Sequence, residues 1–230
     1  MRRRGFFITL EGPEGSGKSS QVKPLVSALR THGCSVVAVH DPGTTPAGKW
    51  LRSLLLHRRG HAMTPMTEAF LFIAGRIQLV RQRIAPALKR GAVVVCDRFH
   101  DSTIAYQGYG GQLDVQWLDR VGRHSIGGIM PDLTIILDVP TRVGFARLHR
   151  ARDRMESKAR AFHERVRRGF LAQARRNRRR IVVVDATQPQ ADIHKKIVSI
   201  VWSRVSQGLA YSGQRIAVRK TYPYTLHAKR

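Results

Sequence analysis

Residues 12–19 have the composition and spacing of a phosphate-binding loop. The segment Gly12-Pro13-Glu14-Gly15-Ser16-Gly17-Lys18-Ser19 fits the pattern G-x-x-x-x-G-K-[ST] directly after an apolar run, residues 6–10. Glycines let backbone N–H groups curl around phosphate oxygens, and the following helix adds the positive end of its dipole. Lys18 is expected to reach the β- and γ-phosphates of a nucleoside triphosphate, and the Ser19 hydroxyl to ligate Mg²⁺. A glycine-rich turn that caps a helix is the alternative, but strand, loop and helix follow here in the required order.

A polar pair outside this loop, Asp97 and Arg98, follows the apolar run 92–96. An unbroken apolar run is typical of a strand buried on both faces of a parallel sheet. Polar residues at the carboxyl ends of such strands commonly form sites. We therefore expect this pair to lie near the phosphate-binding loop.

The elements that must position these residues follow from hydrophobic periodicity. Predicted strands cover residues 6–10, 34–39, 92–96, 133–139 and 181–184. Predicted helices cover residues 20–32, 50–55, 66–88, 115–124 and 191–205. Nearly all-apolar strands that alternate with helices predict an α/β fold, a five-stranded parallel sheet covered by helices on both faces.

Composition indicates one domain and a basic tail. The 230 residues suffice for one α/β domain, residues 1–205, whereas residues 206–230 lack periodicity and are predicted to be flexible. Two cysteines, Cys34 and Cys96, have neither zinc-site nor disulfide-framework spacing, which favours a reducing, cytoplasmic location. No segment approaches the roughly 20 apolar residues of a membrane span.

The charge balance is strongly basic. Lys and Arg number 41 against 15 Asp and Glu, a formal net charge of +26. Such a charge suggests an anionic partner, so weak non-specific nucleic-acid binding is expected. The cations are spread over the whole chain, however, which also fits arginine enrichment on solvated faces.

Five motifs follow one another along the chain. They are the phosphate-binding loop, Asp97-Arg98 with residues 102–108, Pro131-Asp132-Leu133, Asp153-Arg154-Met155-Glu156 and residues 185–189. In this order and spacing they resemble bacterial thymidylate kinase, and the resemblance covers residues 5–205. The resemblance implies a P-loop NTPase fold with strand order 2-3-1-4-5. It also implies transfer of the γ-phosphoryl group of ATP to dTMP, a requirement for Mg²⁺ and a homodimer.

The resemblance assigns the thymine pocket to five residues. Phe72 would stack on the base, and Arg76 would donate to the carbonyl oxygen that cytosine replaces with an amino group. Ser102 and Thr103 would meet the imide edge of the base, and Gln107 is placed beside them in the substrate-binding set.

The resemblance also assigns four further residues to the sugar and phosphate of the acceptor. Tyr106 would crowd the 2′ position and favour deoxyribose, and Glu14 would hold the 3′-hydroxyl. Arg98 would clamp the acceptor phosphate with its planar fork. Plain core packing is the alternative for Phe72 and Tyr106. His40 stands where the family commonly has an arginine that helps to hold phosphate, and it is expected to be a shorter, partly charged substitute.

The donor side combines the loop with a lid, about residues 143–157. The predicted ATP-binding residues are Gly12, Pro13, Glu14, Gly15, Ser16, Gly17, Lys18, Ser19, Ser20, Thr187 and Gln188. Asp97 would orient Mg²⁺ through water. The predicted catalytic residues are Lys18, Asp97, Arg98 and the lid arginines Arg147, Arg150, Arg152 and Arg154. Arginines on a closing lid would stabilise the transferring phosphoryl group, although about half of this run is expected on a solvated face.

Two rival interpretations remain. His40 and Thr44 depart from the family pattern and could reshape the acceptor pocket for another nucleoside monophosphate. A basic nucleic-acid-binding protein with reduced kinase activity is the other alternative. The complete set of transfer residues favours the kinase, because a protein that only binds has no need of it.

Overall fold

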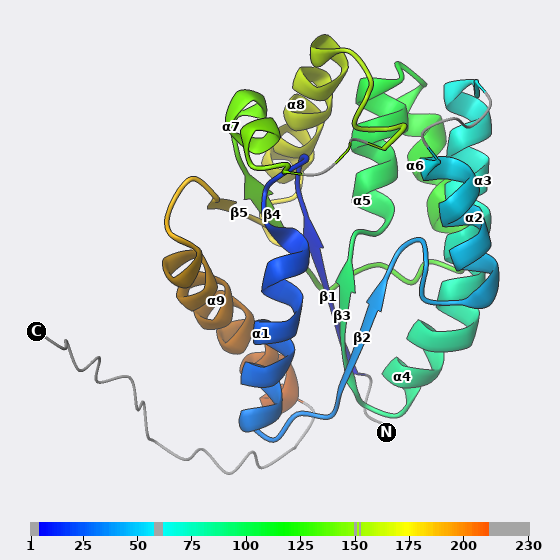
Figure 1. Ribbon diagram of the computed structural model, residues 1–230. Helices are drawn as coiled ribbons and strands as arrows, with labels where there is room; N and C mark the ends of the chain where they lie inside the picture. Colours follow the sequence, from blue (N-terminus) through cyan, green and yellow to red (C-terminus); the bar gives the residue numbers. More distant parts are fainter. Residues whose placement is uncertain (1–4, 58–61, 150, 152, 212–230) are drawn as a thin grey trace, which may run out of the picture.

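Five parallel strands form one sheet in the order β2-β3-β1-β4-β5, as predicted. They are β1 (Phe6–Glu11), β2 (Val36–His40), β3 (Val93–Asp97), β4 (Leu133–Asp138) and β5 (Ile181–Asp185). The computed structural model describes residues 5–57, 62–149, 151 and 153–211. Figure 1 shows the sheet through the middle of the molecule with helices on both sides. The predicted fold class is therefore confirmed.

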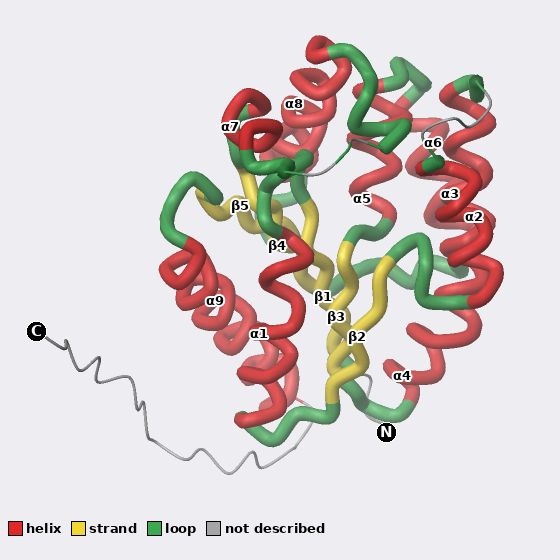
Figure 2. Tube along the Cα trace, in the orientation of Figure 1, coloured by secondary structure: helices red, strands yellow, loops and turns green. Residues whose placement is uncertain are grey.

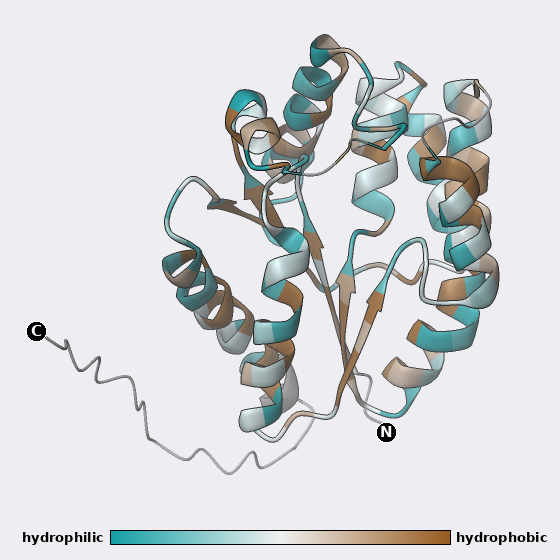
Figure 3. Cartoon of the chain, viewed as in Figure 1, coloured by the Kyte–Doolittle hydropathy of each residue, from teal (hydrophilic) through white to brown (hydrophobic). Residues whose placement is uncertain are grey.

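Two helices, α1 (Lys18–Thr31) and α9 (Gln190–Tyr211), cover one face of the sheet. Neighbouring residues of a strand point to opposite faces, so Ile8 packs with Leu25 of α1 and Ile197 of α9. Its neighbour Phe7 lies in a separate core on the other face. Figure 3 shows the hydrophobic colour concentrated on the strands between these layers. This double burial explains why the strands carry almost no polar residues.

Six helical elements in the described part of the chain cover the other face. They are α3 (Pro65–Leu79), the π-helix η1 (Val80–Ile84), α4 (Ala85–Lys89), α5 (His100–Thr103), the π-helix η2 (Ile104–Gly110) and α8 (Arg160–Arg176). Three of them, α3, α5 and η2, carry predicted acceptor residues. Outside them lie α2 (Pro46–Leu56) and α6 (Val115–Ser125), and α7 (Thr141–Ala146) precedes the lid segment. The helical stretch predicted over 66–88 is thus α3, η1 and α4 in succession.

The last helix is longer than predicted. We expected it to end at 205, whereas α9 continues to Tyr211, six residues into the segment assigned to the tail. Buried Ile193, Ile197, Val201 and Val205 follow helical spacing along it and hold it to the sheet. Residues 212–230 lie outside the described part of the chain. In that part, no helix is long and apolar enough to cross a membrane.

The carboxyl ends of the neighbouring strands β2, β3 and β1 lie together at one end of the sheet. The register places Leu10 of β1 and His40 of β2 on either side of Asp97 of β3. The loops that leave these ends gather at the same side of the molecule, as the green segments in Figure 2 show. Parallel strands bring the ends of separate sequence segments together in this way, and a site formed there is accessible from solvent.

Candidate active site

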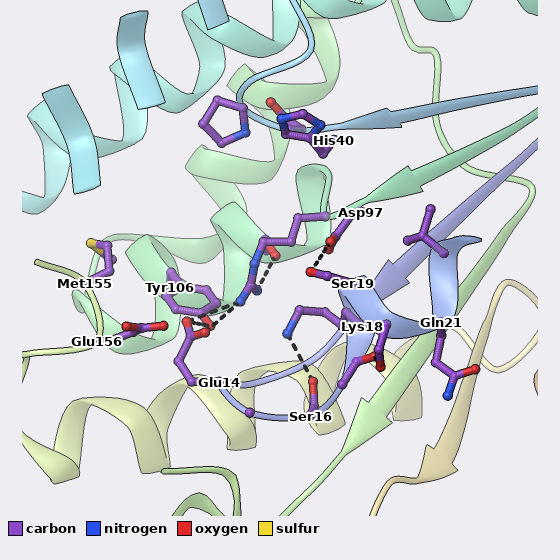
Figure 4. A pocket seen from close by; sticks show the side chains of 18 of the residues that line it. Glu14, Ser16, Lys18, Ser19, Gln21, His40, Asp97, Tyr106, Met155 and Glu156 are labelled. Carbon is purple, nitrogen blue, oxygen red and sulfur yellow. Dashed lines mark hydrogen bonds and ion pairs between the residues drawn. The ribbon is translucent and has the colours of Figure 1, made fainter. Parts of the chain in front are cut away.

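The carboxyl edge of the sheet opens into a cavity of about 1030 Å³, which we call the cleft. Most predicted site residues line it (Figure 4). These are Glu14, Gly15, Ser16, Gly17, Lys18, Ser19, Ser20, His40, Phe72, Arg76, Asp97, Arg98, Ser102, Thr103, Tyr106, Gln107, Arg147 and Gln188. Gly12, Pro13, Thr187 and Arg154 are not among its lining residues. Arg150 and Arg152 lie outside the described residues.

The phosphate-binding loop is held in a conformation that needs glycine. Gly12, Gly15 and Gly17 have φ values of 141°, 67° and 83°. A Cβ atom on Gly15 would lie 1.8 Å from the carbonyl oxygen of Gly144, so the loop packs directly against α7. The loop is therefore shaped by close backbone packing as well as by its own turns.

Lys18 lies across the loop, with its Nζ donating to Pro13 O at 2.8 Å and to Ser16 Oγ at 3.0 Å. Burial, together with the charge of Arg98, lowers the pKa of Lys18 to about 8. Both acceptors belong to the loop that would surround a phosphate. An anionic phosphate placed there would raise the pKa of Lys18 again, since it supplies an opposite charge in a buried site.

Ser19 and Asp97 meet as the predicted metal site requires. The Ser19 hydroxyl donates to Asp97 Oδ2 at 2.6 Å, beside the loop (Figure 4). One hydroxyl and one carboxylate are hard oxygen ligands, and Mg²⁺ characteristically keeps water and substrate phosphates as its remaining ligands. Consistent with this pattern, the described residues contain no cluster of three or more His, Cys, Asp or Glu side chains able to hold a metal alone. The residues present therefore fit Mg²⁺ bound with a nucleotide.

Glu14, Arg98 and Tyr106 form a connected group in the cleft. Arg98 Nη2 donates to both carboxylate oxygens of Glu14, at 3.2 and 3.1 Å, and Tyr106 donates its hydroxyl to the same carboxylate. Burial disfavours the ionised form of Glu14, but the charges of Arg98 and Lys18 outweigh it and lower its pKa. Glu14 is thus an anion held between Arg98 and Tyr106, suited to accept a bond from a sugar hydroxyl.

Arg98 owes its position to an unusual backbone and to Glu11. Its φ is 64°, in the left-handed region that side chains other than glycine rarely adopt. Immediately after it, Phe99 N donates to Glu11 Oε1 at 2.7 Å, and Ser102 Oγ donates to Glu11 Oε2 at 2.6 Å. Glu11 is fully buried, and burial, with the charge of Asp101, raises its pKa to about 8. Sequence reasoning missed Glu11, although a carboxylate at the end of a buried strand was a usable signal.

Arg76 is buried, with one nitrogen left for a ligand. Its Nε donates to Asp41 Oδ2 at 2.6 Å and its Nη2 to Thr103 Oγ1 at 2.8 Å. Its Nη1 has no protein partner although Arg76 lines the cleft. An unpaired buried donor is unfavourable, so this nitrogen fits an acceptor atom brought by a ligand. Phe72, about one turn earlier on the same helix, is half-buried at the same wall.

His40 does not replace the expected arginine as a cation. It is exposed at the end of β2, and partial burial with the charge of Arg52 lowers its pKa, which leaves it neutral at pH 7. Thr44 Oγ1 accepts a bond from His40 N at 2.7 Å, so the second departing residue shapes the same turn. Arg52 also lines the cleft and brings positive charge to this wall.

The two described lid arginines point to different partners. Arg147 donates to Ala186 O at 2.7 Å and Thr187 O at 3.3 Å, which ties the lid to the turn after β5. That turn is fixed by Asp185, which accepts from Thr187 N at 2.9 Å. Arg154 instead pairs with Glu68 at 2.7 Å, on the acceptor side. Its predicted phosphate contact would need this ion pair to open.

Comparisons with known proteins agree with this geometry. Residues 10–197 match the family model described as thymidylate kinase. The thymidylate kinase of Thermomicrobium roseum is 46% identical over 205 residues, covering 88% of this chain and 95% of that protein. The enzyme of Exiguobacterium sp. is 43% identical over 206 residues, covering 89% and 97%. A crystal structure of thymidylate kinase from Ehrlichia chaffeensis superposes with a TM-score of 0.71 at 32% identity, over 86% of this chain and 99% of that one.

Proposed function

The chain belongs to the thymidylate kinase family, and from this premise we propose that it transfers the γ-phosphoryl group of ATP to dTMP, giving dTDP and ADP. One arrangement carries the proposal. A phosphate-binding loop with Lys18 and an acceptor group of Glu14, Arg98 and Tyr106 line the same cleft. A donor phosphate and an acceptor phosphate can therefore be brought together in one cavity.

Catalysis in this reaction is positioning and charge stabilisation, because phosphoryl transfer needs little covalent work from the protein. Lys18 would hold the donor phosphates, and Arg98 would orient the acceptor phosphate. We assign Ser19 and Asp97 as the residues that hold Mg²⁺, which when bound neutralises charge on the donor phosphates. Arg147 would close the donor side, since it already contacts the turn after β5, where Thr187 and Gln188 are predicted to bind ATP.

Selectivity for dTMP would come from the acceptor wall. Arg76 Nη1, buried and without a protein partner, would donate to the thymine carbonyl, and Phe72 would stack on the ring. Tyr106 is held against Glu14 and has little freedom to move away from a 2′-hydroxyl. A cytosine base would place an amino group opposite the Arg76 donor, which leaves that donor unpaired.

An acceptor panel tests this function directly. ADP formation is measured with ATP, Mg²⁺ and, in turn, dTMP, dUMP, the ribose analogue of dTMP, dCMP and AMP. We expect dTMP to be preferred, with dUMP weaker by a modest factor because one buried methyl contributes about 0.8 kcal/mol. Turnover of AMP or dCMP equal to that of dTMP would refute the assignment and favour a kinase of another nucleotide.

We further propose a cytoplasmic homodimer. Both cysteines are free, which suits a reducing compartment. Trp50 on α2 is 73% exposed, and Phe70 and Met66 on α3 are 49% and 38% exposed, on adjacent helices. We propose that these exposed apolar side chains lie in the dimer interface, because large exposed apolar surfaces commonly mark protein interfaces. Light scattering should give the dimer mass for the wild type and the monomer mass for Trp50→Glu/Phe70→Glu.

A further inference from the structure

Glu68, in the first turn of α3, is a buried carboxylate that the phosphoryl-transfer assignment does not use. Its side chain is 1% exposed. Arg154 Nη1 lies 2.7 Å from Oε1, and Lys158 Nζ lies 2.8 and 3.0 Å from the two oxygens. Gln107 Nε2 donates to Oε2 at 3.2 Å. A carboxylate buried to this extent is tolerated only when it is paired and hydrogen-bonded, so these contacts depend on one another.

The partners of Glu68 come from two parts of the cleft. Gln107, on η2, lines the cleft among the acceptor residues. Arg154 and Lys158 flank the lid residues Met155 and Glu156, which line the cleft as well. Glu68 itself is not a lining residue. One buried side chain therefore connects an acceptor-side residue with the carboxyl-terminal end of the lid.

Arg154 extends this connection to α2. Its Nε donates to Leu55 O at 2.8 Å, and its backbone N donates to Leu56 O at 3.2 Å. The hydrogen bonds of the Arg154 guanidinium are thus made to α2 and α3 and not to the phosphate-binding loop. Without the Glu68 charge, Arg154 would be a mostly buried cation without an anionic partner, which would weaken the hold of the lid on this wall.

We propose that Glu68 is a positioning residue that couples occupation of the acceptor pocket to the lid. It acts through Gln107 on one side and Arg154 with Lys158 on the other. An acceptor that orders Gln107 stabilises the ion pairs, which keep Met155 and Glu156 at the cleft wall and water away from the transferring phosphoryl group. This role rests on the proposed function, because it requires dTMP as the acceptor.

The test compares Glu68→Gln, which preserves side-chain shape but removes the charge, with a matched control. Asp138→Asn is the control because it breaks a bidentate carboxylate–arginine pair with Arg167 outside the cleft. For Glu68→Gln we expect KM for dTMP to rise about fivefold or more, a typical coupling factor. We also expect more ADP than dTDP to form, because water replaces the acceptor. The dissociation constant for ATP should not change.

The control should lower Tm but keep the wild-type KM and a one-to-one ratio of ADP to dTDP. In a double-mutant cycle, Arg154→Gln combined with Glu68→Gln should raise KM no more than the larger single change, because both break one connection. If Glu68→Gln does not fold, Arg154→Gln carries the same measurements, since it breaks the connection to the lid while Glu68 keeps Lys158 and Gln107 as partners.

Three results would each contradict a different part of this proposal. A lowered Tm with unchanged KM and product ratio in Glu68→Gln, or in Arg154→Gln where that variant carries the test, would show that Glu68 is only a structural ion-pair residue. Multiplicative effects in the cycle would separate Glu68 from Arg154. A wild-type enzyme that forms no dTDP would refute the proposed function itself.

Discussion

We assign Lys18 to the donor nucleotide and Arg98 to the acceptor, so their substitutions should separate donor from acceptor binding. Lys18 lies across the phosphate-binding loop, whereas Arg98 is paired with Glu14 on the acceptor side. We expect Arg98→Ala to lower kcat/KM for dTMP by about 100-fold or more, as loss of a charge-stabilising donor does. Its ATP affinity should stay near the wild-type value.

Lys18→Ala should show the opposite pattern, with ATP affinity lost first. Titration with a fluorescent ATP analogue and steady-state kinetics measure both quantities. Equal loss of ATP binding in the two variants would show that the division of roles is wrong.

His40 allows a gain-of-function prediction. Because its lowered pKa leaves it neutral at pH 7, the cleft lacks a cation that the family pattern supplies at this position. His40→Arg should maintain or raise kcat/KM for dTMP. A collapse of turnover with an unchanged circular dichroism spectrum would show that the pocket has been rebuilt around histidine, and the acceptor panel repeated on that variant would identify its preferred nucleotide.

Glu11 predicts a specific dependence of stability on pH. Its pKa of about 8 in the fold against 4.5 when exposed means that the folded state keeps a proton that the unfolded chain releases. The stabilisation from this bound proton is fully present below pH 4.5 and is lost as pH rises through 8. Over that range the free energy of unfolding falls by at most about 1.4 kcal/mol per pH unit.

The free energy of unfolding from urea titrations at pH 5.5 and 7.5 measures the effect. The wild type should lose more stability over that interval than Glu11→Gln, which cannot ionise. Glu164→Gln, on an exposed part of α8, is the control and should follow the wild type. Parallel pH profiles of wild type and Glu11→Gln would mean that Glu11 is ionised throughout.

Among the elements, α7 matters because it supports the phosphate-binding loop. A Cβ atom on Gly144 would lie 2.2 Å from Glu14 O, closer than any real contact. Gly144→Ala should therefore displace α7 from the loop, reduce kcat and lower the free energy of unfolding by about 1–3 kcal/mol. The added Cβ in Gly75→Ala meets its nearest atom at 3.4 Å, so this control should be tolerated.

Activity assays and urea unfolding on both glycine variants check this packing. If Gly144→Ala were as active and as stable as Gly75→Ala, the loop would not depend on α7.

At the scale of the whole molecule, the +26 net charge either lies on solvated faces or binds nucleic acid. Many cations occupy helix carboxyl ends, such as Arg30, Arg123 and Arg176, where the helix dipole favours them. This supports the solvated-face interpretation. Since α9 ends at Tyr211, truncation after that residue removes residues 212–230 and leaves the helix complete.

We expect the truncated enzyme to phosphorylate dTMP at the wild-type rate. Binding of both forms to a DNA duplex should be weak and should fall steeply between 50 and 200 mM salt, because phosphate contacts alone contribute (about tenfold or more for a few contacts). Kinase activity should change less, since the cleft contacts are partly buried. DNA binding that survives high salt, or an inactive but folded truncation, would make the basic tail a functional element.

The sequence by itself determined the fold class, the strand order through its family resemblance, and most of the residues that line the cleft. Local sequence features were sufficient for these predictions. Apolar strands indicate burial on both faces of the sheet. Residues 12–19 and the pair Asp97-Arg98 indicate polar site residues at the carboxyl ends of strands. The first and last residues of the strands differ by at most two positions from those predicted, because the residues at strand ends are less uniformly apolar than those in the core.

Tertiary structure alone decided which polar residues meet. Glu68 and Arg154 are separated by 86 positions, and Glu11 and Ser102 by 91, so no periodicity or spacing connects them. The same holds for the neutral state of His40 and the free nitrogen of Arg76, which depend on burial and on neighbours from other elements. Ion pairing and desolvation act through space over a few ångströms, and only the fold sets those distances.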